Sequence, residues 1–182
     1  ALNKGRLAHA FLLTGIRGVG KTTTARIIAK ALNCIGDGSK EDPSFEICNN
    51  CSPCKSINNG NFLDVIEVDA ASRTGVDGIR EIIDSVIYSP NNARYKVYII
   101  DEVHMLSNAA FNALLKTLEE PPQNVKFIFA TTEIKKIPAT IISRCQKFDL
   151  QRVDLKTLSN HLKNICQNES ISFENDAISH IC

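Results

Sequence analysis

Short apolar runs alternate along this chain with stretches in which apolar residues recur at helical spacing. The run at 10–14 is continuous and is followed by Gly15, as is typical of a buried strand. Between Val76 and Pro90 the apolar residues instead recur every three or four positions, which predicts a helix. By the same criteria we expect strands over 10–14, 62–68, 95–100, 125–130 and 146–150, and helices over 21–32, 76–87, 108–118 and 138–143.

This order of elements predicts an α/β fold with a parallel five-stranded sheet flanked by helices, because strands alternate with helices along the chain. Residues 33–61 interrupt the alternation with Cys, Gly, Pro and Asn residues, as an inserted segment would. After about residue 152 the pattern becomes entirely helical. We therefore expect an α/β core over 1–152, an insertion over 34–60 within it, and the start of a helical domain over 153–182.

The composition is ordinary for a globular protein and limits how the chain meets its partners. Its 182 residues are 43% hydrophobic and 23% charged, with a formal net charge of +1. A contact with DNA must then depend on a local patch or on an assembly, because no global basic field exists. No apolar run is long enough to cross a bilayer and no signal peptide opens the chain, so we expect a cytoplasmic protein. The chain starts at Ala1 and stops at Cys182 within a helical pattern, so we interpret it as a fragment.

Residues 15–22 read GIRGVGKT and match the phosphate-binding pattern G-x-x-x-x-G-K-[ST] completely. Glycines let backbone N–H groups turn inward around phosphate oxygens, and the helix that follows presents its positive end to the anion. Lys21 adds a charge for the phosphates, and the Thr22 hydroxyl is a ligand for Mg²⁺. The alternative is a glycine-rich turn with an exposed lysine. The residues expected to bind nucleotide here are Gly15, Gly18, Val19, Gly20, Lys21, Thr22 and Thr23.

Two carboxylates follow the apolar strand predicted over 95–100. Asp101 is placed to hold Mg²⁺, and Glu102 to orient and activate an attacking water. A strand that ends in a solvated turn is the alternative, which the upstream phosphate loop disfavours. His104 follows as a structural or coupling residue without a derived role. Thr131 and Thr132 end another strand, where a hydroxyl can contact the γ-phosphate or the water, or can simply belong to an ordinary strand end.

Four cysteines cluster in the inserted segment, with the spacing C-x13-C-x2-C-x2-C. Clustered thiolates are typical zinc ligands, and a site with four of them leaves no open position for a substrate. An iron–sulfur cluster is the rival, but the x3-C-P continuation of the ferredoxin pattern is absent. Free buried thiols are a second alternative. We predict a structural zinc site formed by Cys34, Cys48, Cys51 and Cys54, whereas Cys166 and Cys182 are expected to pack as small hydrophobic residues.

Several longer segments resemble a known family. They are GIRGVGKTT at 15–23, DAASRT at 69–74, VYIIDEVHMLS at 97–107, FNALLKTLEEPP at 111–122 and IISRC at 141–145. Together these segments resemble the gamma and tau subunits of bacterial DNA polymerase III, and the resemblance covers almost the whole chain. The cysteine cluster is also similar to the zinc module of that family.

The resemblance implies an AAA+ ATPase core followed by a helical lid domain. It also implies a ring-like hetero-oligomer, a heteropentamer in this family, with ATP sites between neighbouring subunits. ATP binding would open the sliding clamp, and hydrolysis would release it around primer–template DNA. By the family's S-R-C motif, Arg144 would act in trans as an arginine finger on a neighbour's ATP, and Thr132 would be the sensor at the end of the fourth strand. Arg73 would contact DNA phosphates, although the residues around it equally fit a helix N-cap.

Two departures from the family pattern are expected to weaken the isolated chain. The family's adenine-binding segment before the first strand is absent, and the lid's sensor arginine would lie beyond Cys182. We therefore predict weak ATP binding and poor hydrolysis by this chain alone. A helicase and a scaffold subunit with an inactive nucleotide site are the other two hypotheses. A helicase needs a second motor domain and further nucleic-acid motifs, and none appears in this sequence. The intact Lys21, Thr22, Asp101 and Glu102 argue against a scaffold.

Overall fold

The structure is a computed structural model that describes residues 7–38, 42–44, 46–72 and 76–181, with the side chains of residues 76 and 77 excepted. Two compact units divide the chain, Ala1–Leu150 and Gln151–Cys182. Arg73, the predicted DNA contact, lies outside the described residues. Within the described ranges, no helix combines the length and the apolar character that crossing a membrane requires.

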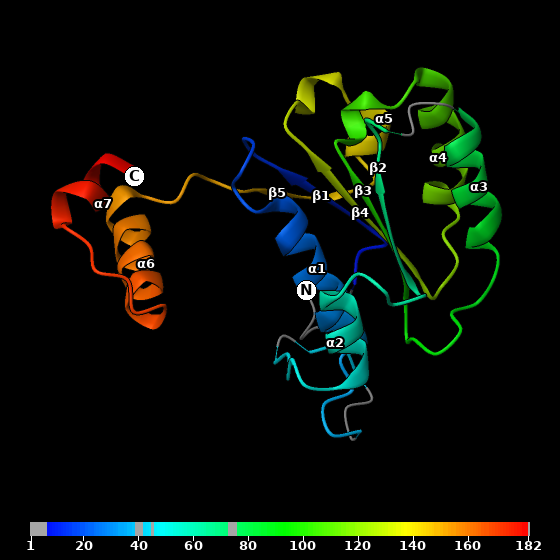
Figure 1. The fold of residues 1–182 in the computed structure, drawn as a ribbon. Helices are drawn as coiled ribbons and strands as arrows, with labels where there is room; N and C mark the ends of the chain where they lie inside the picture. Colours follow the sequence, from blue (N-terminus) through cyan, green and yellow to red (C-terminus); the bar gives the residue numbers. More distant parts are fainter. Residues whose placement is uncertain (1–6, 39–41, 45, 73–75, 182) are drawn as a thin grey trace. The chain divides into compact units, whose positions relative to one another are not determined.

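The first unit contains a parallel sheet of five strands, as the sequence predicts (Figure 1). All four neighbouring strand pairs run parallel, in the order β2-β3-β4-β1-β5. The carboxyl ends of all five strands therefore meet at one edge, where loops can bring distant parts of the chain together. The strands are β1 (Ala10–Thr14), β2 (Val65–Asp69), β3 (Lys96–Asp101), β4 (Val125–Thr131) and β5 (Gln146–Asp149).

Helices cover both faces of this sheet (Figure 1). One face packs against α3, α4 and α5, and the other against α1 and α2. Leu12 of β1 belongs to the first core and its neighbours Phe11 and Leu13 to the second, because side chains alternate across a strand. The helices of this unit are α1 (Lys21–Asn33), α2 (Ser52–Asn58), α3 (Val76–Val86), α4 (Asn108–Glu119) and α5 (Ala139–Ile142), with short 3-10 turns η2 (Val103–Met105) and η3 (Ile134–Lys136).

The start of β2 differs from the sequence prediction. We expected this strand to begin at residue 62, but the chain turns at Leu63 and Asp64 and β2 begins at Val65. The Asp64 carboxylate is buried and accepts backbone hydrogen bonds from Asn91, Asn92 and Ala93 at 2.8–3.0 Å. Leu63 is left 77% exposed. The apolar character of Leu63 suggested a strand, but the hydrogen bonds of Asp64 to residues far along the chain hold a turn there instead.

The insertion contains a helix, α2, that the sequence pattern did not indicate. It has seven residues, begins after Cys51 and carries Pro53 near its start, where a missing N–H costs nothing. Ile57 anchors it in the core beneath α1. A helix this short has too few apolar residues to show the helical spacing of three or four positions. Its cysteines and proline therefore led to the prediction of an irregular insertion.

The second unit consists of α6 (Leu155–Asn168) and α7 (Asn175–Ile181). The carboxylate of Asp154 caps α6 by accepting a hydrogen bond from the Thr157 backbone N–H at 2.9 Å. Ile178 of α7 is buried, whereas Leu155 at the start of α6 is 66% exposed. The two helices lie against each other.

Candidate nucleotide-binding site

The loop between β1 and α1 has a backbone that its glycines make possible. Gly18 has a φ of 83°, a conformation that residues with a Cβ rarely adopt. At Gly15, an added Cβ would lie 2.6 Å from the backbone oxygen of Leu150, the residue after β5. The loop is therefore both tightly curled and closely packed against the end of the sheet.

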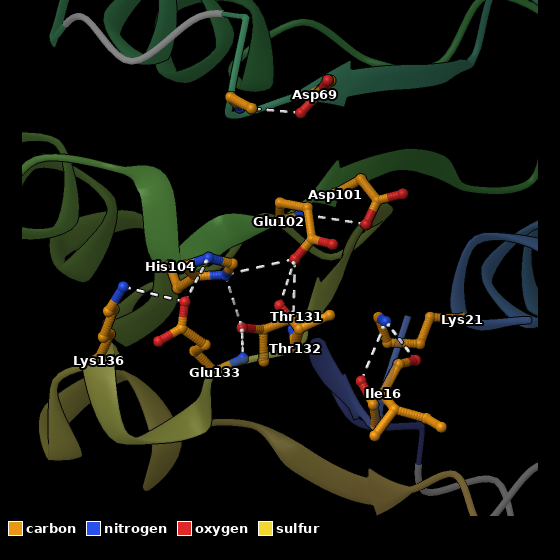
Figure 2. A network of polar contacts seen from close by, with 12 residues as sticks. Ile16, Lys21, Asp69, Asp101, Glu102, His104, Thr131, Thr132, Glu133 and Lys136 are labelled. Carbon is orange, nitrogen blue, oxygen red and sulfur yellow. Dashed lines mark hydrogen bonds and ion pairs between the residues drawn. The ribbon is translucent and has the colours of Figure 1, made fainter. Parts of the chain in front are cut away.

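Lys21 and Thr22 begin α1 with their side chains turned toward this loop and the acidic strand end. Lys21 is only 6% exposed, and its Nζ donates hydrogen bonds of 3.0 Å to the carbonyl oxygens of Gly15 and Ile16 (Figure 2). The Thr22 hydroxyl donates to Asp101 Oδ2 at 2.5 Å. The polar groups of the motif and of the acidic strand end are thus brought together from β1 and β3, which lie on either side of β4 in the sheet.

A cavity of about 430 Å³ opens at this point on the carboxyl edge of the sheet. Most of the predicted nucleotide-binding residues line it, whereas Gly15 and Val19 belong to the loop but are not among the lining residues. The cavity therefore joins the loop, the helix start and the acidic strand end in one site. Its lining residues are Arg17, Gly18, Gly20, Lys21, Thr22, Thr23, Asp69, Asp101 and Glu102.

Glu102 follows β3 directly and has an unusual backbone conformation. Its φ of 45° and ψ of 44° lie in the left-handed region, which costs a residue with a side chain about 1–2 kcal/mol. Its N–H donates to Asp101 Oδ1 at 2.9 Å. Its Oε2 accepts from the backbone N–H of Thr132 at 3.3 Å and from the hydroxyl of Thr132 at 3.1 Å (Figure 2). Thr132 is thus in direct contact with the predicted base.

A second cavity of about 580 Å³ adjoins this acidic group and is lined by Glu102, His104 and Thr132 among others. His104 contacts Glu102, Thr131 and Glu133 (Figure 2). A hydrogen bond and an ion pair with Lys136 lower the pKa of the Glu133 carboxyl below its usual range. Sequence reasoning derived no role for His104, so this network is a finding of the structure.

Asp69 and Arg17 are site residues that sequence reasoning did not single out. Both line the two cavities. Asp69 ends β2 in register with Asp101 of β3, so two aspartates lie on neighbouring parallel strands at the same edge. The signal for Asp69 existed in the sequence, because a carboxylate follows an apolar strand there as it does at Asp101.

Arg144, the predicted arginine finger, does not line either cavity of its own chain. Its guanidinium donates to Glu119 Oε1 at 2.6 Å and to the Thr140 carbonyl oxygen at 2.8 Å. The side chain remains 34% exposed. It therefore joins the end of α4 to α5.

The four clustered cysteines come together in the inserted segment. Their Sγ atoms all lie within 4.8 Å of one another, and those of Cys34 and Cys48 are 3.6 Å apart. A tetrahedron of Zn–S bonds of about 2.3 Å puts its sulfurs about 3.8 Å apart. The spacing and the all-thiol donor set therefore fit a zinc ion. The four residues are Cys34, Cys48, Cys51 and Cys54.

Backbone amides around this cluster favour thiolates. Hydrogen bonds from the N–H groups of Cys51 and Asn50 lower the pKa of the Cys48 thiol to about 6. The Cys48 N–H donates a hydrogen bond to Cys34 Sγ at 3.4 Å. Burial raises the pKa of Cys54, a cost that a bound cation would offset.

The fold and the site together define a P-loop protein of the AAA+ class. Over 98% of this chain, the fold is similar to that of the Thermotoga maritima RuvB Holliday junction branch migration motor, with a TM-score of 0.62 and 20% sequence identity, covering 50% of that chain. This likeness concerns the fold alone. The chain itself belongs to a DNA polymerase III subunit family, whose model, described as DNA polymerase III, delta subunit, matches residues 1–154.

Curated relatives confirm the resemblance to the gamma and tau subunits. The chain is 54% identical over 180 residues to DNA polymerase III subunit gamma of Buchnera aphidicola subsp. Acyrthosiphon pisum, covering 99% of this chain and 48% of the relative. It is also 54% identical over 177 residues to subunit tau/gamma of Haemophilus influenzae, covering 97% of this chain and 25% of the relative. The chain thus spans between a quarter and about half of the length of these two proteins.

Proposed function

We propose that this chain is the nucleotide-binding part of an ATPase subunit of the bacterial DNA polymerase III clamp loader. In this proposal, ATP binding and hydrolysis drive the loading of the sliding clamp onto primer–template DNA, with other loader subunits as neighbours in a ring. One observation carries it: Lys21, Thr22, Asp101 and Glu102 surround one cavity at the carboxyl edge of the sheet. The names of the relatives support the same assignment.

The loop and the start of α1 would bind the triphosphate. Lys21 is buried, and in the described part of the chain its Nζ donates to two carbonyl oxygens, so anionic phosphate oxygens would be stronger partners for it. The N–H groups at the start of α1 add the positive end of the helix dipole, and no side chain caps them. Thr23 lines the same cavity one residue further along.

Thr22 and Asp101 would hold Mg²⁺. Both offer oxygen, the donor that this hard cation prefers, and their oxygens already lie 2.5 Å apart. When bound, the ion would neutralise charge on the phosphate oxygens.

Glu102 would act as the general base of hydrolysis. Its carboxylate would take a proton from water as the water oxygen bonds to the γ-phosphorus, while the bond from that phosphorus to the bridging oxygen of ADP breaks. The products are ADP and inorganic phosphate. Two hydrogen bonds from Thr132 fix the orientation of this carboxylate, which supports a sensor role for Thr132.

Arg144 would stabilise the transition-state charge at a neighbouring subunit's ATP. Its exposure, and its absence from the lining of both cavities of its own chain, support action in trans.

The second unit, Gln151–Cys182, would be the start of the helical lid. Zinc at the four cysteines would serve structure alone, since thiolates would occupy every coordination position. Arg73 stays a predicted DNA contact.

The test is a Lys21→Ala substitution in the complete protein assembled with its partner subunits. We expect DNA-stimulated ATP hydrolysis and clamp loading to be lost while the assembly still forms, because the substitution removes only the phosphate-binding charge. Lys116→Ala, an exposed lysine on α4, is the matched control and should keep both activities. Clamp loading that survives Lys21→Ala would instead support a scaffold subunit with an inactive site.

A further inference from the structure

His104 lies at the centre of a polar network beside Glu102 (Figure 2). Its side chain is 7% exposed, and both ring nitrogens face oxygen atoms. Nδ1 lies 3.0 Å from Thr131 Oγ1 and 3.3 Å from Glu102 Oε2, and Nε2 lies 3.4 Å from Glu133 Oε1. A carboxylate only accepts hydrogen bonds, so a ring N–H that faces one can donate to it, and donation from both nitrogens at once requires both ring protons.

The partners of His104 are themselves fixed. Thr131 is fully buried at the end of β4, and its hydroxyl accepts the Glu133 N–H at 3.0 Å. Glu133 is paired with Lys136 at 2.9 Å across the η3 turn. The imidazole therefore joins the end of β3 to the end of β4, the two strands that deliver Glu102 and Thr132.

Glu102 needs this support because its own geometry is demanding. Its backbone is in the left-handed region, and its Oε2 has three neighbours that can donate, namely the N–H and hydroxyl of Thr132 and His104 Nδ1. Thr132 supplies two of these donors, and the imidazole of His104 is the third neighbour of this oxygen. A base must be held within a fraction of an ångström of its productive position to keep its full effect.

We propose that His104 is a positioning residue for ATP hydrolysis, which holds the Glu102 carboxylate through Nδ1 and anchors its own ring to Glu133 through Nε2. The inference rests on the proposed ATPase function. His104 lines the second cavity and not the one that contains Lys21, Thr22 and Asp101, so in this proposal it acts through Glu102 and not on the nucleotide. The contact to Glu102 determines the rate, and the contact to Glu133 only steadies the ring.

The two nitrogens can be tested separately. The amide nitrogen of asparagine can take the place of Nδ1, whereas that of the longer glutamine can take the place of Nε2. His104→Asn should therefore keep the contacts to Glu102 and Thr131, and His104→Gln should keep only the contact to Glu133. His104→Ala removes both. Lys135→Ala is the matched control, because Lys135 is exposed on η3 next to Lys136 and is not part of the network.

The measurement is steady-state ATP hydrolysis by the complete protein in its assembly. We expect His104→Ala and His104→Gln to lower kcat by about 10- to 100-fold with KM changed by less than about twofold, since orientation of the base and not nucleotide binding is lost. His104→Asn should restore kcat to within about threefold of the wild type. Lys135→Ala should match the wild type in both constants.

Four results would overturn the inference. A wild-type kcat in His104→Ala would remove the positioning role while leaving the proposed function intact. Equal impairment of the Asn and Gln variants, or a raised KM with unchanged kcat, would reduce His104 to a structural residue. Absence of hydrolysis in the wild-type assembly would overturn the proposed function, and this inference with it.

Discussion

At the scale of single residues, Gly15 and Gly18 are required for different reasons. Both have positive φ, at 150° and 83°. Only Gly15 is also enclosed, since a Cβ there would meet the Leu150 oxygen at 2.6 Å, whereas nothing lies within 4 Å of a Cβ at Gly18. Backbone oxygen cannot move aside as a flexible side chain can, so an alanine at Gly15 must displace the loop or the end of β5.

This difference predicts unequal losses of stability. Gly18→Ala should lower the free energy of unfolding by about 1–2 kcal/mol, the cost of the left-handed conformation. Gly15→Ala should lower the free energy of unfolding by about 1–3 kcal/mol more than Gly18→Ala does, because steric overlap with Leu150 is added. Urea unfolding of the two variants and the wild type measures this directly. Equal losses in the two variants would show that the contact with Leu150 carries no energy.

The residues of the site divide into those that a sequence can reveal and those that it cannot. Lys21, Thr22, Asp101 and Glu102 were predictable because a local motif and a strand end define each of them. His104 and Glu133 were not, because their importance comes from a contact between the ends of β3 and β4. Asp69 was overlooked although it follows its predicted strand as Asp101 does, because it lacks the second adjacent carboxylate that drew attention to Asp101 and Glu102.

At the scale of elements, the parallel sheet was predictable because alternating strands and helices leave few other arrangements. The start of β2 was not, because the buried Asp64 binds backbone amides of a loop distant in sequence. Helix α2 was hidden by its length. Elements whose apolar residues recur at strand or helix spacing were thus predicted, whereas a boundary set by a contact distant in sequence was not.

The inserted element supports a prediction about zinc. Purified protein should contain about one zinc ion per chain, and Cys51→Ser should abolish it, because the remaining three thiolates leave the tetrahedron incomplete. Cys166→Ser, on α6 and outside the cluster, is the control and should retain the metal. Elemental analysis of the dialysed proteins measures the content. Iron together with sulfide would favour a cluster, and metal-free wild type would favour free thiols.

Acid should also release this metal. The lowered pKa of Cys48, about 6, means that its thiolate form is favoured above that value and is lost as the pH falls through it. Zinc retention should accordingly weaken below about pH 6 and be stable at pH 7. A zinc-sensitive dye added across a pH series reports the release.

At the scale of the whole molecule, Arg144 predicts cooperation between subunits. Arg144→Ala should leave Mg·ATP binding by this chain unchanged but lower hydrolysis in the assembly by on the order of 10³-fold, since the arginine would act on a neighbour's nucleotide. Glu119→Ala is the control, because it breaks the ion pair to Arg144 while retaining the guanidinium. Unchanged hydrolysis in Arg144→Ala, or equal loss in both variants, would contradict action in trans.

The central claim is that the loop after β1 and the end of β3 together bind a magnesium-bound triphosphate. Calorimetric titration of ATP into the complete protein, with and without Mg²⁺, tests it most directly. We predict saturable binding that Mg²⁺ strengthens, with the Mg²⁺-dependent part lost in Asp101→Asn and nearly all binding lost in Lys21→Ala. Binding that is absent from the wild type, or equally strong in Lys21→Ala, would contradict the account.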